Sequence, residues 1–374
     1  MSKIKVLHVL HAVGGVDVYL RLITRNINSD KFELVVVHGT TDTDKTYFDK
    51  KNNVLKEFKI PINRDINIIK DLKCIYQLIR IIKKEKPDLI HAHSAKGGII
   101  ARAAAVFFST KVFYTPHAFS YLSAECEKKK KLYLLIEKFF KLPNVTILAT
   151  SKSEAKRAIS EVGFREKNVK IFENCINPIS VSQKNNPLKF ELPKRFISSV
   201  GRPSFQKNIE AMVEVFKSVN NKLPDVHLIL MGVGFYAPNV DRVKSLLKKY
   251  NLEDKFIMLP WISQEEIYTI INQSELYIST SRYEGLPYSV IESLALGKAC
   301  VVSDCDGNRD LVTNHENGFV IGQEKMEYEM PEAILKILTN KTLKEQFERN
   351  SLQRFDMEHN ILLRIEDLEE VYLK

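Results

Sequence analysis

Short β-rich runs alternate with longer helical patterns along this chain of 374 residues. Such alternation is typical of parallel sheets whose strands are joined by crossover helices. Between the runs, apolar residues recur at three- and four-residue spacing, for instance over 70–84, as a helix with one buried face requires. The strand-like segments of the first half are 4–10, 32–37, 88–91, 112–114, 145–149 and 169–172. This half is predicted to form one doubly wound α/β domain.

The alternation stops over residues 176–195, which are rich in polar residues and proline, and then starts again. The later strand-like segments are 196–200, 227–231, 256–259, 276–279 and 299–303. A soft prior of about 150 residues per domain also favours two domains. We expect four parts: an N-terminal Rossmann-like domain over 1–178, a linker over 179–195, a C-terminal Rossmann-like domain over 196–355, and a C-terminal helix over 356–374 that could cross back to the first domain.

The composition is that of an ordinary folded protein, since 44% of the residues are hydrophobic and 27% are charged. The net charge of +10 favours an anionic partner, such as a nucleotide phosphate or an acidic membrane surface. No nucleic-acid recognition motif accompanies the charge, so we expect no nucleic acid partner. No apolar stretch is long enough to cross a bilayer. The five cysteines form no CxxC pair, which favours a reducing, cytoplasmic location.

Residues that directly follow strands are candidates for a ligand site, because open α/β sheets bind ligands beyond the carboxyl ends of their strands. Gly14 and Gly15 end the loop after the first expected strand. Their backbone could approach a phosphate or sugar closely. A paired glycine at such a place is, however, more often simple turn chemistry.

Histidines follow two further strands of the first domain. His91, His93 and Ser94 lie at one strand end, and His117 lies just past the next strand. We expect them near one edge of the sheet. They could bind a metal, but no cysteine or carboxylate joins them at ligand spacing, and structural or substrate-orienting roles are commoner. We therefore expect no metal site.

Two cations follow the first strand of the second domain. Arg202 comes directly after the strand, and Lys207 lies five residues later, near the expected start of a helix. Together with the helix amides they could hold a diphosphate. The alternative is a pair of solvated surface cations, which is the commoner state for any single lysine or arginine.

The segment 280–303, TSRYEGLPYSVIESLALGKACVVS, combines two acidic residues with a helix start. Pro287 suits the first helical turn, which would place Glu292 within reach of a ligand at the helix N-terminus. Amides such as those of Leu286 and Tyr288 would bind an anion, and the two carboxylates would bind sugar or ribose hydroxyls. Alternatively, Glu284 caps the helix and Glu292 lies on its solvent face.

The pattern E-G-L-P-Y-S-V-I-E resembles the E-x7-E motif of retaining glycosyltransferases of family 4, a bacterial polysaccharide-type group. Paired glycines near the N-terminus, GRxxxxKN after the linker, MGVG at 231–234 and SDCDGNRDLV at 303–312 occur in the order that the family shows. The resemblance covers essentially the whole chain. It implies the GT-B fold, an α/β fold in which two Rossmann-like, doubly wound domains face a central cleft.

The resemblance also implies roles for single residues. Arg202 and Lys207 would bind the diphosphate of the donor, and Glu292 would bind the ribose hydroxyls. Glu284 would bind the transferred sugar and His117 would hydrogen-bond it, so these two are the catalytic candidates. The further donor-binding candidates are Gly15, Gly232, Ile262, Gly285, Leu286 and Tyr288. The acceptor-side candidates are Gly14, His93 and Ser94.

The family implies transfer of a hexose or N-acetylhexosamine from a nucleotide diphosphate sugar, with UDP expected, to a glycan or polyprenyl-diphosphate-linked acceptor in cell-surface polysaccharide synthesis. A front-side displacement without metal or other cofactor is expected. Trp261 stands where the family commonly has glycine, which could change how the nucleobase is held. Residues 127–141, EKKKKLYLLIEKFFK, could lie on an anionic membrane and place the protein at the inner face of the plasma membrane, or form a core helix with a solvated basic face.

Three other functions fit this chain less well. UDP-sugar 2-epimerases also use two Rossmann-like domains, but they lack this E-x7-E arrangement. A nicotinamide-dependent oxidoreductase would need GxGxxG with an acidic residue about 20 positions later, and that pattern is absent. A catalytically inactive sugar-nucleotide-binding partner subunit would not need the candidate histidine, cations and acids together.

Overall fold

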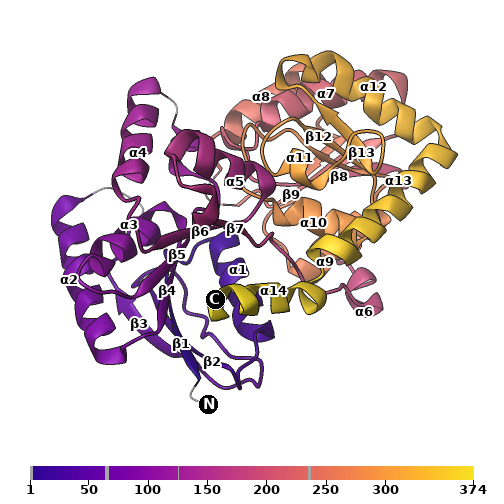
Figure 1. The fold of residues 1–374 in the computed structure, drawn as a ribbon. Coiled ribbons are helices and arrows are strands. Elements are labelled where there is room, and N and C mark those ends of the chain that lie inside the picture. Colours follow the sequence, from indigo (N-terminus) through magenta and orange to yellow (C-terminus); the bar gives the residue numbers. More distant parts are fainter. Residues whose placement is uncertain (1–2, 64–66, 125, 235–236) are drawn as a thin grey trace. The chain divides into compact units, whose positions relative to one another are not determined.

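The computed structural model describes residues 3–63, 67–124, 126–234 and 237–374. The chain divides into two compact units. The first unit combines the chain up to Cys175 with Ile361–Lys374, and the second is Ile176–Asn360. Each unit is a parallel sheet with helices on its two faces (Figure 1).

The sheet of the first unit has seven strands in the order β3-β2-β1-β4-β5-β6-β7. They are β1 (Ile4–Val9), β2 (Phe32–Gly39), β3 (Lys56–Ile60), β4 (Leu89–His93), β5 (Lys111–Thr115), β6 (Val145–Ala149) and β7 (Val169–Ile171). The strand order reverses between β1 and β4, and their register pairs His8 with His91. Such a reversal is where doubly wound sheets bind ligands.

Helices cover both faces of this sheet. They are α1 (Gly15–Asn26), α2 (Ile68–Glu85), α3 (Ser94–Ala105), α4 (Glu127–Phe139), α5 (Lys152–Arg157) and α14 (Ile361–Leu373). The apolar sides of α2, α3 and α5 share one buried cluster with the strands, whereas α1 packs in another and contacts α14. The C-terminal helix begins at Ile361, not at residue 356, and is part of the first unit.

A buried ion pair attaches α4 to the rest of its unit. Arg102 of α3 lies 2.9 Å from the Glu137 carboxylate, which also accepts a hydrogen bond of 2.9 Å from the Tyr114 hydroxyl. Among the described residues of α4, only Glu137 is buried. In the described parts of the chain, no helix combines the length and the apolar character that spanning a membrane requires.

The second unit has six strands in the order β10-β9-β8-β11-β12-β13, which reverses between β8 and β11. The strands are β8 (Phe196–Val200), β9 (His227–Met231), β10 (Phe256–Met258), β11 (Tyr277–Ser279), β12 (Cys300–Ser303) and β13 (Gly318–Ile321). The helices are α6 (Val181–Lys184), α7 (Ile209–Lys222), α8 (Val240–Lys249), α9 (Gln264–Gln273), α10 (Tyr288–Ala295), α11 (Asn308–Leu311), α12 (Met326–Thr339) and α13 (Lys341–Arg354).

The segment 179–195, which the sequence presents as a linker, lies inside the second unit. Ile179, Leu188 and Leu192 pack against an apolar cluster formed by β8, β9 and α9. The first stretch of the first unit ends at Cys175 and not at residue 178, and the second unit ends at Asn360 and not at residue 355. These apolar side chains are spaced without a helical or strand period, so the sequence pattern does not show their burial.

Candidate functional site

Lys207 and Glu284 form an ion pair at the carboxyl edge of the second sheet, in the loops that follow β8 and β11. The Lys207 ammonium lies 2.7 Å from the Glu284 carboxylate. Glu284 is buried and also accepts hydrogen bonds from the Ser281 hydroxyl (2.7 Å) and the Gln206 amide (3.2 Å). Burial works to lower the pKa of Lys207, but the attraction of Glu284 outweighs it, so this pKa is raised. Lys207 is therefore a fixed cation and not a solvated one.

Glu292 lies in α10 and is buried, so the solvent-face interpretation of this residue is wrong. Its carboxylate accepts hydrogen bonds from the Gln264 amide (3.1 Å) and the Tyr268 hydroxyl (3.5 Å) of α9. Burial raises the pKa of Glu292 to about 7. Glu284 does not cap α10 either, because the N-cap residue is Pro287.

The other donor-binding candidates of the second unit lie in loops at the same edge of the sheet. Arg202 is the second residue after β8 and is partly exposed, and Gly232 directly follows β9 with φ +91°. Ile262 is partly buried just before α9, and the neighbouring Trp261 is 77% exposed. An added Cβ on Gly234 would overlap the indole nitrogen of Trp261, so this ring lies directly against the loop after β9.

The loop before α10 is packed against the loop after β12. Leu286 is buried in it, while Gly285 and Tyr288 are partly exposed. Gly307 has φ +76°, and an added Cβ there would lie only 2.5 Å from the Gly285 carbonyl oxygen. Gly307, in the 303–312 motif, therefore allows the two loops to approach this closely.

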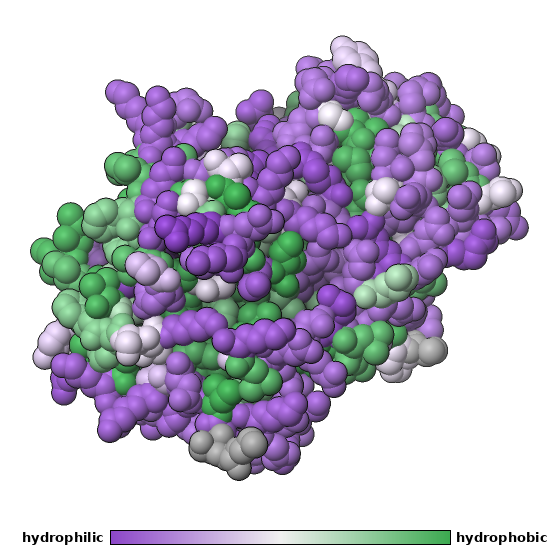
Figure 2. All heavy atoms as spheres, viewed as in Figure 1, coloured by the Kyte–Doolittle hydropathy of each residue, from purple (hydrophilic) through white to green (hydrophobic). Residues whose placement is uncertain are grey.

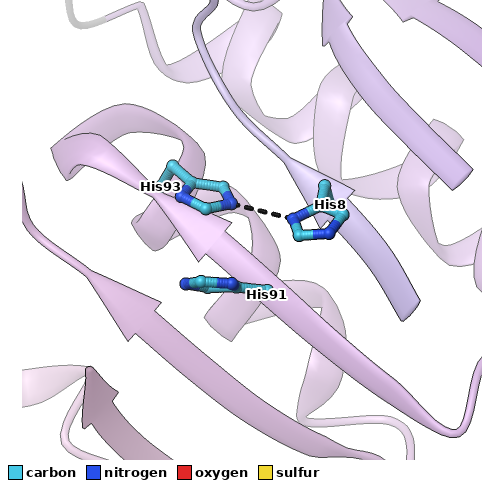
Figure 3. A group of neighbouring side chains, drawn as sticks. All are labelled: His8, His91 and His93. Atoms are coloured by element: carbon cyan, nitrogen blue, oxygen red, sulfur yellow. Dashed lines mark hydrogen bonds between the residues drawn. The ribbon is translucent and has the colours of Figure 1, made fainter. Parts of the chain in front are cut away.

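In the first unit, histidines gather near the carboxyl ends of the neighbouring strands β1 and β4. His8 of β1 and His93 of β4 are fully buried, and His8 Nδ1 lies 3.0 Å from His93 Nε2 (Figure 3). His93 Nδ1 lies 3.4 Å from Nε2 of His117, whose ring is stacked at a centroid distance of 5.6 Å. Ser94 begins α3 directly after His93 and is partly exposed. The candidates His93 and His117 are therefore in contact.

His91 is held separately by two hydroxyl groups. The Thr115 hydroxyl donates its hydrogen to the Leu148 carbonyl, so it can only accept from His91 Nε2, at 2.8 Å. Tyr372 of α14 then donates to His91 Nδ1 at 2.6 Å. The His91 ring consequently carries its hydrogen on Nε2.

Burial keeps this histidine cluster neutral. It lowers the pKa of His8 and His117 to about 3 and that of His91 and His93 well below the usual value. Ligand atoms of His8, His91 and His93 lie within 4.8 Å of one another, but among the described residues no carboxylate or thiol joins them. Both nitrogens of His91 and of His93 are already hydrogen-bonded. This bonding favours a structural or orienting role over metal binding.

The turn that carries His117 is held by a buried carboxylate. His117 and Ala118 both have positive φ, of +54° and +74°. Glu154 of α5 accepts hydrogen bonds of 2.7 Å from the Ala118 amide and from the Thr150 amide. Left-handed backbone at two successive non-glycine residues is costly and persists only where the surroundings enforce it.

The glycine loop of the first unit is open at its tip. α1 begins at Gly15, and Gly14 is its N-cap residue, with φ +61° and nothing within 4 Å of an added Cβ. Asp42 anchors the preceding residues, since it lies 2.8 Å from the His11 ring and accepts from the Ala12 amide. Free space beside a fixed backbone fits close approach of a ligand.

Family models match almost the whole chain. The model described as Glycosyltransferase Family 4 matches residues 13–179, and the model described as Glycosyl transferases group 1 matches residues 181–354. The chain belongs to the family 4 glycosyltransferases. Family membership confirms the resemblance inferred from the motifs and supports a transferase over an epimerase or an oxidoreductase.

Related glycosyltransferases cover most or all of the chain. The Escherichia coli UDP-Gal:alpha-D-GlcNAc-diphosphoundecaprenol alpha-1,3-galactosyltransferase is 25% identical over 100% of this chain and 97% of its own length. The Staphylococcus aureus capsular polysaccharide biosynthesis glycosyltransferase CapM is 25% identical over 85% of this chain and 86% of its own length.

Solved structures confirm the GT-B fold. Sucrose-phosphate synthase from Thermosynechococcus elongatus superposes with a TM-score of 0.86 at 17% identity, covering 100% of this chain and 98% of the other. Anabaena HepE, solved with UDP and glucose, has a TM-score of 0.77 at 16% identity and covers 100% of both chains.

Several contributors to this glycosyltransferase's candidate site are not evident from the sequence. Gln206, Ser281, Gln264 and Tyr268 hydrogen-bond the two acidic residues. No sequence pattern points to these four residues, although Gln206 lies inside GRxxxxKN. His8 could have been found from the sequence, since a histidine inside the apolar run VLHVL is expected to be buried and to need a hydrogen-bond partner.

Proposed function

We propose that this glycosyltransferase moves a hexose or N-acetylhexosamine, with retention of configuration, from a UDP-sugar to a glycan or polyprenyl-diphosphate-linked acceptor in cell-surface polysaccharide synthesis. The observation that carries the proposal is the fixed Lys207–Glu284 pair at the same sheet edge as the buried Glu292. The E. coli relative is named for transfer from UDP-Gal to a diphosphoundecaprenol-linked sugar, and HepE was solved with UDP. These names support the donor and acceptor classes.

The second unit would bind the donor. The charges of Lys207 and Arg202 suit the diphosphate, and the Glu292 carboxylate suits the two ribose hydroxyls, which can both donate to it. Glu284 would accept from hydroxyls of the transferred sugar while keeping Lys207 in place. Ribose binding would favour the ionised form of Glu292, which burial disfavours in the free protein.

The proposed reaction is a front-side displacement. The bond between the anomeric carbon and the β-phosphate oxygen breaks, a bond to the acceptor oxygen forms on the same face, and the acceptor proton passes to the departing phosphate. The protein's part is to stabilise negative charge on the diphosphate, with Lys207 and Arg202 aimed at it. Glu284 organises the donor and is not a covalent nucleophile. His117 would orient the sugar by a hydrogen bond.

We propose that no divalent metal takes part, because fixed cations of the chain would balance the diphosphate charge. Lys207 is held at 2.7 Å from its carboxylate partner before any donor is present. Its position is therefore set in advance, which lowers the reorganisation cost at the transition state. Sugar transfer that is lost after treatment with a chelator and restored by added Mg²⁺ or Mn²⁺ would contradict the proposal that no metal takes part.

A thermal-shift panel of UDP, GDP, ADP and their sugar conjugates without metal tests the donor site. We expect stabilisation by the UDP compounds, of about 2.7 kcal/mol at a concentration 100 times the Kd. Lys207→Ala should abolish it. Lys222→Ala is the matched control, because Lys222 also pairs with a glutamate, Glu332, at 2.6 Å but on an exposed surface. Equal stabilisation of wild type and Lys207→Ala would contradict the assignment of Lys207.

We further propose that α4 contacts an anionic membrane at the inner face of the plasma membrane. Leu132, Leu135 and Phe139 are 50%, 63% and 76% exposed on this helix, among the lysines of 127–141. Exposed apolar side chains of α2 and the residues after α3 add to this side of the first unit, where Figure 2 shows hydrophobic side chains at the surface. Apolar insertion combined with basic charge is how interfacial helices bind.

Vesicle co-sedimentation tests the membrane contact. We expect binding to vesicles containing anionic lipid and loss of binding in Leu135→Asp/Phe139→Asp. Tyr328→Asp is the control, because Tyr328 is similarly exposed, at 74%, on α12 of the second unit. Equal binding of all three proteins, or binding that does not depend on anionic lipid, would contradict the proposal.

A further inference from the structure

Three imidazole rings form a hydrogen-bonded chain that runs from the core of the first unit to its surface. The chain links His8 Nδ1 to His93 Nε2 and His93 Nδ1 to His117 Nε2. His8 and His93 are fully buried, whereas the His117 ring is partly exposed. Among the described residues, only His93 hydrogen-bonds the His117 ring. The Tyr19 ring packs edge-on against it at a centroid distance of 4.7 Å, and the bond to His93 determines which nitrogen of His117 carries hydrogen.

A neutral imidazole carries one N–H and one lone pair, so each hydrogen bond of the chain fixes the next ring. Only two arrangements satisfy both bonds. Either all three rings carry hydrogen on Nδ1 and donate outward toward His117, or all three carry it on Nε2 and donate inward toward His8.

The environment of His8, at the buried end of the imidazole chain, distinguishes the two arrangements. His8 Nε2 is buried and has no hydrogen-bond partner. The inward arrangement would leave an N–H group at this atom without an acceptor, and buried N–H groups without partners are rare in folded proteins. The outward arrangement leaves a lone pair there and moves the free N–H to the partly exposed His117.

We infer that His8 and His93 are positioning residues that hold the His117 ring in its Nδ1–H form, so that this ring presents a hydrogen-bond donor at the ligand edge of the first sheet. The inference rests on the proposed function for its ligand, a sugar nucleotide, whose hydroxyl and phosphate oxygens accept hydrogen bonds. Glu154 holds the backbone of the same turn. Ring and backbone of His117 are thus fixed from two sides.

Nitrogen NMR of the full-length, histidine-labelled protein tests the inference without any ligand. Two-bond hydrogen–nitrogen correlations distinguish Nδ1–H from Nε2–H rings, and His117→Gln identifies the signal of His117. We expect His8, His93 and His117 in the Nδ1–H form and His91 in the Nε2–H form. An Nε2–H form of His117 or His93 in the wild type would overturn the inference. This result comes from the wild-type protein, so it does not depend on whether a His93 variant folds.

Two variants of similar shape test the dependence on His93. His93→Asn keeps a side-chain amide donor near the position of Nδ1, whereas His93→Leu has none. We expect the Nδ1–H form of His117 to persist in the Asn variant and to become mixed in the Leu variant. Turnover should fall about tenfold in the Leu variant and recover in the Asn variant, as for loss of one neutral hydrogen bond. An unchanged His117 form in the Leu variant would overturn the inference.

Failure of this inference and failure of the proposed function are separable, because UDP binding is measured independently. Absence of UDP binding with an Nδ1–H form at His117 would contradict the proposed function and support the imidazole chain. UDP binding with an Nε2–H form at His117 would support the proposed function and contradict the inference about the imidazole chain.

Discussion

Glu292 combines burial in α10 with a pKa raised to about 7. Because its folded-state pKa lies above its unfolded value, the stability linked to its proton is fully present below about pH 4.5 and is lost as the pH rises through about 7. We predict that Glu292→Gln gains up to about 3 kcal/mol of unfolding free energy relative to wild type between pH 4.5 and pH 8. Urea denaturation at the two pH values measures it.

The control for this prediction is Glu332→Gln, which alters a glutamate of α12 whose side chain is 67% exposed. Its stability relative to wild type should change little between the two pH values. A Glu292→Gln difference that is equally independent of pH would show that this carboxyl group titrates normally in the folded protein.

At the residue scale, the acidic pair, the cations and His117 were singled out by their places after expected strands, and their roles were inferred from the resemblance to the family. The sequence could not predict the ion pair between Lys207 and Glu284, since the partners are far apart in the chain and meet only because β8 and β11 are neighbours. Burial of Glu292 was likewise invisible, because it depends on how α9 packs beside α10. The ligand roles of these residues stay predictions.

The packing of the two loops beside α10 can be tested with one glycine. Gly307→Ala would place a Cβ 2.5 Å from the Gly285 carbonyl and force the loop before α10 to move. Gly163→Ala is the control, because Gly163 also has positive φ but its added Cβ would meet only the flexible end of Lys141. We predict that Gly307→Ala loses about 2 kcal/mol more unfolding free energy than the control. Equal losses in urea denaturation would contradict close packing of the loops.

The attachment of α4 gives a second prediction at the scale of elements. Glu137→Leu leaves the Arg102 charge buried without its partner, so we expect a loss of about 3 to 5 kcal/mol in unfolding free energy. Adding Arg102→Met should recover most of that loss, because no unpaired charge remains. Urea denaturation of the single and double variants measures both values, and a double variant no more stable than Glu137→Leu would exclude this explanation.

At the scale of elements, the central strands were predicted from their apolar runs, but β3 and β13 were not. Both are edge strands. Lys56–Ile60 reads KEFKI, whose charged residues suit a strand that has only one neighbour, and Gly318–Ile321 is too short to show a period. The other two edge strands, β7 and β10, were predicted, so it is the charged or short sequences of β3 and β13 that hid these two.

At the scale of the whole molecule, the chain returns to its first unit, and Tyr372 of α14 reaches the buried histidines there. Tyr372→Phe leaves the His91 Nδ1 lone pair without a donor. We predict a loss of about 1 to 3 kcal/mol in unfolding free energy. Tyr328→Phe, at an exposed position of α12, should change it by less than about 0.5 kcal/mol. Equal effects would mean that α14 does not contribute this hydrogen bond.

The two Rossmann-like domains were predictable because each doubly wound sheet leaves its own alternating pattern in the sequence, whereas the GT-B fold was implied by the resemblance to the family. The boundaries were less predictable. Residues 179–195 carry no period, yet their scattered apolar side chains pack in the second unit. A boundary is set by which core a segment joins, and composition reports that only indirectly.

Transfer measured in the presence of a chelator tests the central claim most directly. The reaction would contain UDP-galactose, UDP-glucose or UDP-N-acetylglucosamine and a polyprenyl-diphosphate-linked N-acetylglucosamine, with the anomeric configuration of the product read by NMR. We predict an α-linked product formed at an undiminished rate without metal, and turnover about 10² to 10³ times lower in Lys207→Ala. A β-linked product, or wild-type turnover in Lys207→Ala, would contradict the proposed donor site and mechanism.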